Sequence, residues 1–521
     1  MKGKRMILAG ITILGFIVLT EAQGLPAERT EELVLAEDQW GNEIPIPHME
    51  ISQGLDYMKL LYDPLVGTTP DEKLSTEHGV ANKWEMSPDG LTWTFYIRKG
   101  VKFHDGVELT GKDVKFSLEQ VMQPDSKIAA ASDLRVTIKN VEVKAPYTLV
   151  VHCKKPSIFL PELLNDTWST AALIQPKEYY ERVGRDKAVK NPIGSGPYKF
   201  HSQMAGSFIK LEAINKHWWA GVPRFKYVTF RIVPEEFTRI AMLRTGEVDI
   251  VRVSREKVKE VLDAGLNVLV KENANMISFT PNMQWASPVF SDIRFRKALN
   301  LAIDKEAIIK RILGGRAKPT TNYPGMNLLA CGGDRTLKPY PYDPGEARRL
   351  IKEGGHDGHE FIVPSYTRGA APELPSIVET LSSYWEKAGL KPKIVNLDWL
   401  TWRQSMRSQK TPNNIHGNAY AVDPECASLL NRLRLIYHSK SEQTVVKIPE
   451  IDAMIERAEK SLDRAEVSRL IGDIHRYVHQ QYIDIPICDT GQDIATTKRV
   501  PKWDPGQRRM GSNINDIIRR R

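Results

Sequence analysis

Two pairs of histidines have the spacing of metal ligands. His356 and His359 are three residues apart, and His475 and His479 are four residues apart on the edge of a predicted helix. Neither pair forms a complete motif such as H-E-x-x-H, and a zinc site needs three or four ligands. We therefore expect no metal site and no other cofactor.

The chain also lacks a recognisable nucleophile with an oriented base. No complete G-x-S-x-G, Walker or G-x-G-x-x-G motif is present. The sequence GSG at 194–196 is explained by a turn before Pro197. We expect no enzymatic activity; a secreted hydrolase is the weaker alternative, and turnover of candidate substrates would distinguish it.

The first residues predict export from the cytoplasm. Basic residues at 2, 4 and 5 precede an apolar run from Met6 to Thr20 and small or polar residues at 22–24. The run is shorter than the roughly 20 residues that span a bilayer, so residues 1–22 are predicted to be a signal peptide cleaved after Ala22 or Gly24. No cysteine lies near this point, so a lipoprotein anchor is not expected and the mature protein would be periplasmic.

Four cysteines lie far apart, at positions 153, 331, 426 and 488, and no C-x-x-C is present. An oxidising compartment would permit disulfides, and the sequence leaves the three pairings open.

Length and composition predict a soluble protein of several folding units. A chain of 521 residues with 41% hydrophobic and 26% charged residues is expected to form two to four units. Its formal net charge of +9 falls to +7 without residues 1–22. Because acidic and basic residues are evenly mixed, this charge predicts a solvated surface and no nucleic-acid partner.

Hydrophobic periodicity predicts mixed α/β structure. Strands are expected at 32–36, 91–97, 226–233, 393–395 and 483–487, and residues 136–153 are rich in β-formers. Helices are expected after Thr110 and Asp343, where capping residues stand, and along the apolar stripes of 292–303, 377–388, 451–462 and 467–477.

A resemblance to a known family begins at Trp84. The segment 84–121 is WEMSPDGLTWTFYIRKGVKFHDGVELTGKDVKFSLEQV, which is similar to the family 5 extracellular solute-binding proteins, the peptide, opine and nickel class. Further blocks match in order: YDPLV at 62–66, GSGPYKF at 194–200, FRIVPEEFTRIAMLRTGEVDI at 230–250, DIRFRKALNLAIDKEAII at 292–309 and YDPGEARRLIKEGG at 342–355. These blocks identify the family, and their residues are expected to be structural.

The resemblance implies an α/β, two-lobed periplasmic-binding-protein fold of type II, cluster C, with an extra domain inserted in the first lobe. Domain I would comprise 30–62, 190–277 and 489–521, domain II 63–189, and domain III, the second lobe, 278–488. It also implies a small-molecule ligand held between the lobes and delivered to the permease subunits of an ABC transporter in the inner membrane. A monomer is expected. A ligand-binding sensor for a membrane receptor shares this fold and is the main alternative.

The resemblance also points to ligand-binding residues in the second lobe. Dipeptide-binding members have an arginine, four residues before a proline, that holds the ligand carboxylate, and Arg368 and Pro372 keep this spacing. A guanidinium pairs with carboxylate through two hydrogen bonds. An interlobe salt bridge is the alternative role for Arg368.

The segment HGNAYAVDP at 416–424 departs from the family pattern. Asn418 occupies the position of a family tryptophan, and no acid precedes Asp423 to bind the free amine of a peptide. Unless Asp423 substitutes, ligands without a free α-amine, such as opine- or saccharide-like compounds, are favoured over ordinary peptides. Ring-stacking candidates, each with a structural role as the alternative, are Trp40, Trp399, Trp402 and Tyr420.

Overall fold

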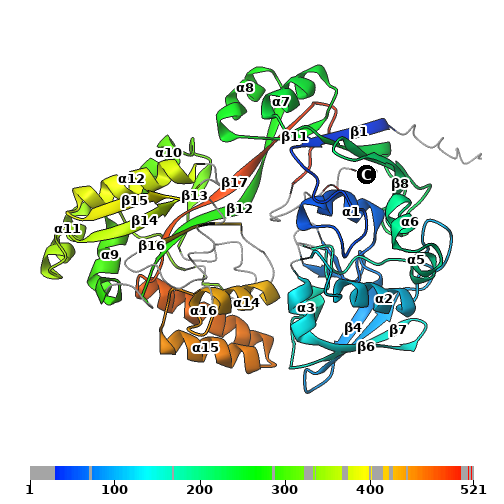
Figure 1. Cartoon of the computed structure of the whole chain (residues 1–521), viewed down its shortest axis with the longest axis horizontal. Coiled ribbons are helices and arrows are strands. Elements are labelled where there is room, and N and C mark those ends of the chain that lie inside the picture. Colours follow the sequence, from blue (N-terminus) through cyan, green and yellow to red (C-terminus); the bar gives the residue numbers. More distant parts are fainter. Residues whose placement is uncertain are drawn as a thin grey trace, which may run out of the picture.

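The chain forms two lobes joined by two long strands, β12 (Asn267–Pro281) and β17 (Ile485–Thr496) (Figure 1). This computed structural model describes residues 30–521 apart from 70–72, 129, 167–168, 284–287, 322–332, 335, 367–372, 398–400, 402–414, 422–425, 442–443, 506–513, 515–517 and 519–521.

One nine-stranded sheet runs through both lobes. Its order is β16-β12-β17-β11-β1-β10-β9-β8, and β13 also pairs with β17. β1 lies parallel to β10 and β11, and the other pairs are antiparallel. The strands not yet bounded are β1 (Thr30–Glu37), β8 (Tyr198–Met204), β9 (Phe208–Ala213), β10 (Phe225–Ile232), β11 (Ile250–Val253), β13 (Ala317–Pro319) and β16 (Ile415–Ala421).

Three helices accompany the first-lobe part of this sheet: α1 (Leu55–Leu61), α7 (Glu236–Thr245) and α8 (Val258–Asp263). Leu33 and Leu35 of β1, two residues apart and so on one face, are buried in a cluster with Phe230 and Trp40. Helices α7 and α8 lie where the joining strands enter this lobe (Figure 1).

A separate four-stranded antiparallel sheet, β4-β5-β7-β6, lies in the same lobe. Its buried cluster is distinct from that of the large sheet and includes Trp93, Phe95 and Ile97. The elements of this region are β2 (Gly67–Thr68), β3 (Leu74–Ser75), β4 (Ala81–Met86), β5 (Thr92–Ile97), α2 (Gly111–Val121), α3 (Ala131–Thr137), β6 (Ile138–Ala145), β7 (Thr148–Cys153), α4 (Leu160–Leu163), α5 (Lys177–Val183) and α6 (Arg185–Lys190).

The second lobe has two buried clusters. In one, Trp385 and Phe361 pack with helices against the parallel pair β14–β15 and the β17 end. The other is formed mainly by three helices, α14 to α16. The elements are α9 (Ile293–Leu301), α10 (Lys305–Arg311), α11 (Pro344–Glu353), β14 (Glu360–Ser365), α12 (Leu374–Lys387), β15 (Lys391–Asn396), α14 (Cys426–Tyr437), α15 (Pro449–Lys460) and α16 (Arg464–Gln480).

The structure confirms several predicted elements, and it shows the local interactions that cause them. The side chains of Thr110 and Asp113 form the expected capping box at the start of α2. Asp343 accepts a hydrogen bond from the backbone N–H of Glu346 at the start of α11. β5 alternates between half-buried and buried residues, as its sequence pattern predicts.

The last predicted strand was too short. The apolar run ends at Ile487, but β17 continues to Thr496 through polar residues and Gly491. Pairing with β12 and β11 along its whole length overrides the weak strand preference of this polar stretch.

No helix in the described part of the chain is long and apolar enough to cross a membrane. The predicted signal peptide lies outside the described residues. Cys153 and Cys488 are buried free thiols, so the pairings that involve either of them do not form in this structure. The side chains of Cys331 and Cys426 lie outside the description.

Candidate functional site

The two strands that join the lobes have an irregular stretch between them. Lys271 pairs with Gln492 and Asn275 pairs with Thr490, so three residues of β12 stand against the single Gly491 of β17. Such a bulge interrupts the ladder and bends it locally. A Cβ atom on Gly491 would lie 2.7 Å from Val270 Cγ1 and 3.1 Å from the carbonyl oxygen of Lys271, so the backbones approach closely here. The bulge and the glycine together break the regular ladder between the lobes, and we name this place the hinge.

Arg255, two residues after β11, ties the lobes together beside this hinge. Its guanidinium donates hydrogen bonds to Glu373 Oε1 at 2.8 Å, to the carbonyl oxygen of Arg316 at 2.9 Å and to that of Gly491 at 3.0 Å. Arg316 in turn pairs with Asp493 of β17. The planar guanidinium satisfies three acceptors in one fixed geometry. It therefore fixes the start of α12, which follows the segment 367–372 in sequence.

A buried carboxyl group ends β1 in the first lobe. Glu37 Oε1 lies 3.2 Å from Arg252 Nε, and the Glu37 side chain is only 9% exposed. Burial raises the pKa of Glu37 to about 7, although the charges of Arg252 and Arg239 act in the opposite direction. Glu37 and Arg255 both stand near the carboxyl ends of parallel strands, the edge where open α/β sheets bind ligands. This edge of the first lobe is therefore charged and titrates near neutral pH.

On the second-lobe side, β16 extends the sheet beyond β12. The backbone of Asn418 lies opposite Ser278, and that of Tyr420 lies opposite Met276. Ser278 is 1% exposed, and its hydroxyl oxygen has no hydrogen-bond partner among the described residues. A buried hydroxyl without a partner costs free energy and is a feature of binding sites that a ligand or water completes.

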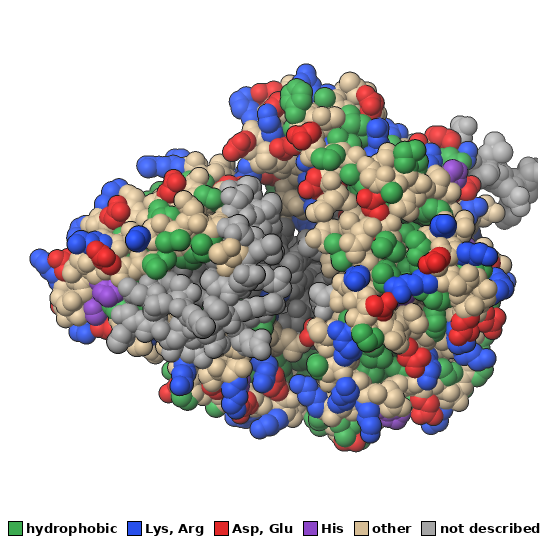
Figure 2. Space-filling view, in the orientation of Figure 1, with side chains coloured by type: hydrophobic (Ala, Val, Ile, Leu, Met, Phe, Trp, Pro, Cys, Tyr) green, Lys and Arg blue, Asp and Glu red, His purple; other side chains and the backbone are tan. Residues whose placement is uncertain are grey.

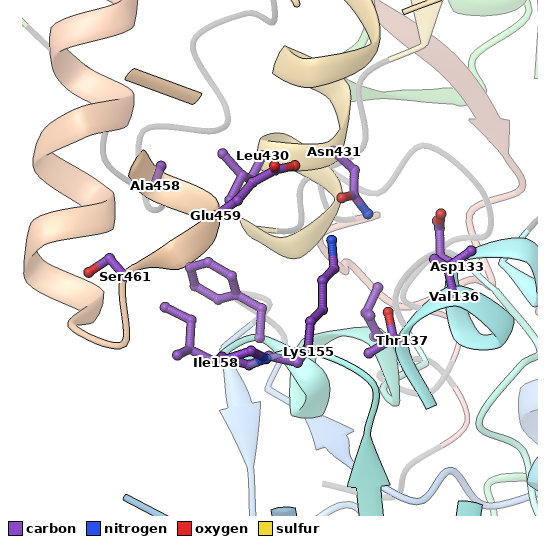
Figure 3. Close-up of a pocket in the computed structure, with 14 residues that line it drawn as sticks. Asp133, Val136, Thr137, Lys155, Ile158, Leu430, Asn431, Ala458, Glu459 and Ser461 are labelled. Atoms are coloured by element: carbon purple, nitrogen blue, oxygen red, sulfur yellow. The ribbon is translucent and has the colours of Figure 1, made fainter. Parts of the chain in front are cut away.

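The molecular surface is hollowed between the two lobes (Figure 2). Within the described residues, one pocket is lined from both sides of this gap. Residues 155–159 and Leu163 line it from the first lobe, and Leu430, Asn431, Ala458, Glu459 and Ser461 line it from the second (Figure 3). Lys155 points across it toward Asn431. Its volume of about 100 Å³ is well below the 300–1,000 Å³ of ordinary ligand sites, so it is a seam between the lobes with room for water.

Most predicted ligand-binding residues fall outside what the structure describes. Arg368, Trp399, Trp402 and Asp423 lie in segments that are not described. For Asn418 and Tyr420 only the backbone position in β16 is given. Their roles in binding therefore stay predictions.

Trp40 lies in the core of the first lobe. It is 2% exposed, its indole N–H donates to the carbonyl oxygen of Arg231 at 2.9 Å, and its ring meets Phe230 edge-on. A ring that is packed in this way has no free face for a ligand. In this structure Trp40 therefore has the structural role that was the alternative to stacking on a ligand.

The histidine pairs make other contacts. His356 Nε2 lies 3.0 Å from Asp292 Oδ2, and His479 Nε2 lies 2.8 Å from the carbonyl oxygen of Lys338. His475 is 2% exposed in the helical core. No group of three potential metal ligands occurs among the residues that the structure describes.

Sequence reasoning missed the residues that join the lobes, namely Arg255 and the set Ile158, Glu162 and Arg464. Each meets a partner more than 60 positions away, and Arg464 meets Glu162 across 302 positions. No local pattern indicates such a pair, because charged residues at helix ends are common in any soluble protein.

Comparison with known proteins defines the class. A model of the middle region of the bacterial extracellular solute-binding proteins, family 5, matches residues 76–433. This chain therefore belongs to that family of solute-binding proteins.

Individual relatives lie within the same family. The glutathione-binding protein GsiB of Salmonella paratyphi A is 29% identical over 342 residues, and GsiB of Pectobacterium atrosepticum is 31% identical over 346 residues. Each alignment covers 65% of this chain and 64% of the relative, so the chain spans a little under two thirds of the length of these relatives.

A solved structure shows the same fold. The ABC transporter substrate-binding protein CtaP of Listeria monocytogenes superposes with a TM-score of 0.79 at 22% identity, covering 93% of this chain and 98% of CtaP. The chain thus has the mixed α/β, type II periplasmic-binding-protein fold that the sequence predicts.

Proposed function

We propose that this chain is the solute-binding component of an ABC importer. It would capture a small molecule between its lobes outside the cytoplasm and deliver it to permease subunits in the inner membrane. It would bind without catalysing a reaction.

The hinge is the observation that supports this proposal most. Two strands join the lobes, and the register of their ladder shifts twice, at the bulge opposite Gly491 and again between Ile277 and Ser278. Rotation within this irregular stretch would open or close the gap without unfolding either lobe, which is how two-lobed binding proteins trap ligands.

For the ligand we propose a small solute with a net negative charge. Arg368 would hold its carboxylate, with Asn418, Tyr420, Asp423, Trp399 and Trp402 as further candidate contacts. The segment 416–424 lacks the family acid for an ammonium group, which favours an anionic ligand without a free α-amine, such as an opine. The family relatives above are named for glutathione, which has two carboxylates but also one free amine, so glutathione is the probe that tests this preference.

Ligand-induced stabilisation tests the proposal directly. The purified chain would be melted with glutathione, trialanine, an opine and a disaccharide, each at several concentrations. Binding to the native state raises the melting temperature in proportion to the logarithm of ligand concentration. Stabilisation without turnover supports a binding protein. Turnover of a probe would refute the proposal in favour of a hydrolase, and stabilisation by trialanine alone would refute the ligand class.

A matched pair of variants tests the role of Arg368. Arg368→Ala removes the proposed partner of the carboxylate, and a charge-assisted pair is worth about 2 kcal/mol, or about 30-fold in Kd. Arg348→Ala removes an exposed arginine of α11 in the same lobe and should leave Kd unchanged. Equal affinities for both variants would exclude Arg368 from the site.

We further propose the domain division 30–62 with 190–277 and 489–521, then 63–189, then 278–488, because the buried clusters of the described residues follow similar limits. Export through a cleaved signal peptide and a monomeric state belong to the same proposal. Mass spectrometry of the secreted chain would give both the mature N-terminus and the oligomeric state.

A further inference from the structure

The lobes touch at a second place, away from the hinge. Residues 156–163 of the first lobe meet α14, α15 and the start of α16 in the second lobe, around the seam of Figure 3. In Figure 1 this contact lies at the opposite side of the gap from the strands β12 and β17. We name residues Ile158, Phe159, Glu162, Leu462 and Arg464 the tip contact.

An apolar side chain of the first lobe is buried in the second. Ile158 is 5% exposed and belongs to the cluster of α14, α15 and α16, which otherwise consists of second-lobe residues and Met276 of β12, with Phe159 packed at its edge. Burying an isoleucine side chain lowers its free energy relative to leaving it in water. Separating the lobes would expose both Ile158 and the surface that covers it.

The facing surfaces also fit closely at Gly90. A Cβ atom at this position would lie 2.5 Å from Leu462 Cδ2 of the second lobe and 3.2 Å from Pro156 Cβ of its own lobe, so a larger residue would require the Leu462 side chain to move. Gly90 also has φ +69°, which its turn requires.

Arg464 supplies the polar part of the tip contact. It donates to Glu162 Oε1 at 2.5 Å and Oε2 at 3.2 Å, and to the carbonyl oxygen of Ile158 at 2.6 Å, while its guanidinium lies 5.2 Å from the centre of the Phe159 ring. The Glu162 side chain is 9% exposed, whereas that of Arg464 is 50% exposed. A cation on the first turn of a helix opposes the helix dipole, so the partners across the gap, and not its own helix, favour Arg464 at this position.

We propose that the tip contact is a latch that holds the two lobes together in the ligand-free chain. The hinge permits rotation, and the latch biases the population toward the closed form before any solute binds. Such a bias would raise the apparent affinity for a ligand that binds the closed form, because less of the closing free energy has to come from the ligand. The proposal concerns only the equilibrium between the open and closed forms of the chain and does not depend on which solute binds.

Scattering and hydrogen exchange on the ligand-free chain test the latch. Arg464→Ala and Ile158→Asp should each lower the closed fraction, with an increase in the radius of gyration and about tenfold faster amide exchange in 156–163. Arg469→Ala is the control, because Arg469 lies on the same helix and, among the residues that the structure describes, forms its ion pairs with Glu466 and Asp473 of that helix. It should change neither quantity, and circular dichroism should show all variants folded.

A charge swap makes the test independent of folding defects. Arg464→Glu alone places two carboxylates together and should open the lobes, whereas Arg464→Glu with Glu162→Arg should restore the wild-type radius of gyration. The latch is refuted if wild type and Arg464→Ala have the same radius of gyration and the same exchange in 156–163. It is also refuted if the double swap remains as open as the single one.

Discussion

The buried histidine of α16 predicts a specific loss of stability in mild acid. His475 is 2% exposed, and burial lowers the pKa of its imidazole to about 4, from an ordinary value near 6.5. In the unfolded chain the imidazole takes up a proton as the pH falls through about 6.5, whereas in the folded chain it stays neutral until about pH 4. The unfolded state therefore binds more protons between these values, and stability falls as the pH falls.

The magnitude follows from the two pKa values. Between pH 7.5 and pH 5.5 the histidine alone should lower the free energy of unfolding by about 1.4 kcal/mol, the cost of one pH unit below the unfolded pKa. For a unit of the size of the second lobe this equals a fall in melting temperature of about 3–6 °C. His475→Gln removes the titrating group and should lose this part of the pH dependence, even if the variant is less stable at pH 7.5.

Calorimetric melting of the wild type and His475→Gln at both pH values measures the difference. Other groups titrate in this range, including Glu37, but they are common to both proteins and cancel in the comparison. His201→Gln, which replaces an exposed histidine on β8, is the control for the loss of a histidine that is not buried in a helix. If His475→Gln keeps the full acid shift, or if NMR titration places the His475 pKa near 6.5, the reasoning fails.

Three further predictions concern Asp63, Arg255 and Cys153. Asp63 accepts hydrogen bonds from the indole N–H groups of Trp218 and Trp219 at 2.8 and 2.7 Å and lies 3.2 Å from His217 Nε2. Asp63→Ala removes the buried carboxylate that these three side chains share and should cost about 3–5 kcal/mol by denaturant titration, whereas a loss below 1 kcal/mol would contradict this account. Arg255→Ala breaks three hydrogen bonds beside the hinge and should speed amide exchange at the start of α12, a change that should be absent from α15. Cys153, whose thiol pKa burial raises to about 11, should resist alkylation in the native protein as mapped by mass spectrometry, and rapid modification would show that its site opens.

Local structure could be predicted from the sequence where its cause is local. Thr110 and Asp113 are three residues apart, so the capping box that starts α2 is encoded within one turn. The alternation in β5 likewise reflects a strand with one buried face. β12 was not predicted as a strand, because its polar middle, KENAN at 271–275, gives no strand pattern; the residues on both sides of this bulge pair with β17.

Part of the candidate site could likewise be identified from the sequence, and part could not. Arg368 and the segment 416–424 were identified through family resemblance, and their roles in binding stay predictions; the backbone of Asn418 and Tyr420 lies on a strand beside β12 that was not predicted from the sequence. Aromatic character alone could not separate a stacking residue from a core residue, and Trp40 proved to be packed in the core because β10 brings Phe230 and Arg231 against it.

The sequence by itself determined the family, the mixed α/β class and the positions of helices with caps and apolar stripes, because these depend on residues within a few turns of each other. Only the tertiary structure decided where the lobes bend and where they meet. The hinge exists because Gly491 faces the middle of β12 more than 200 positions away, and the tip contact exists because Arg464 reaches Glu162 across 302 positions. Such contacts depend on the packing of whole lobes, which no local pattern of residues records.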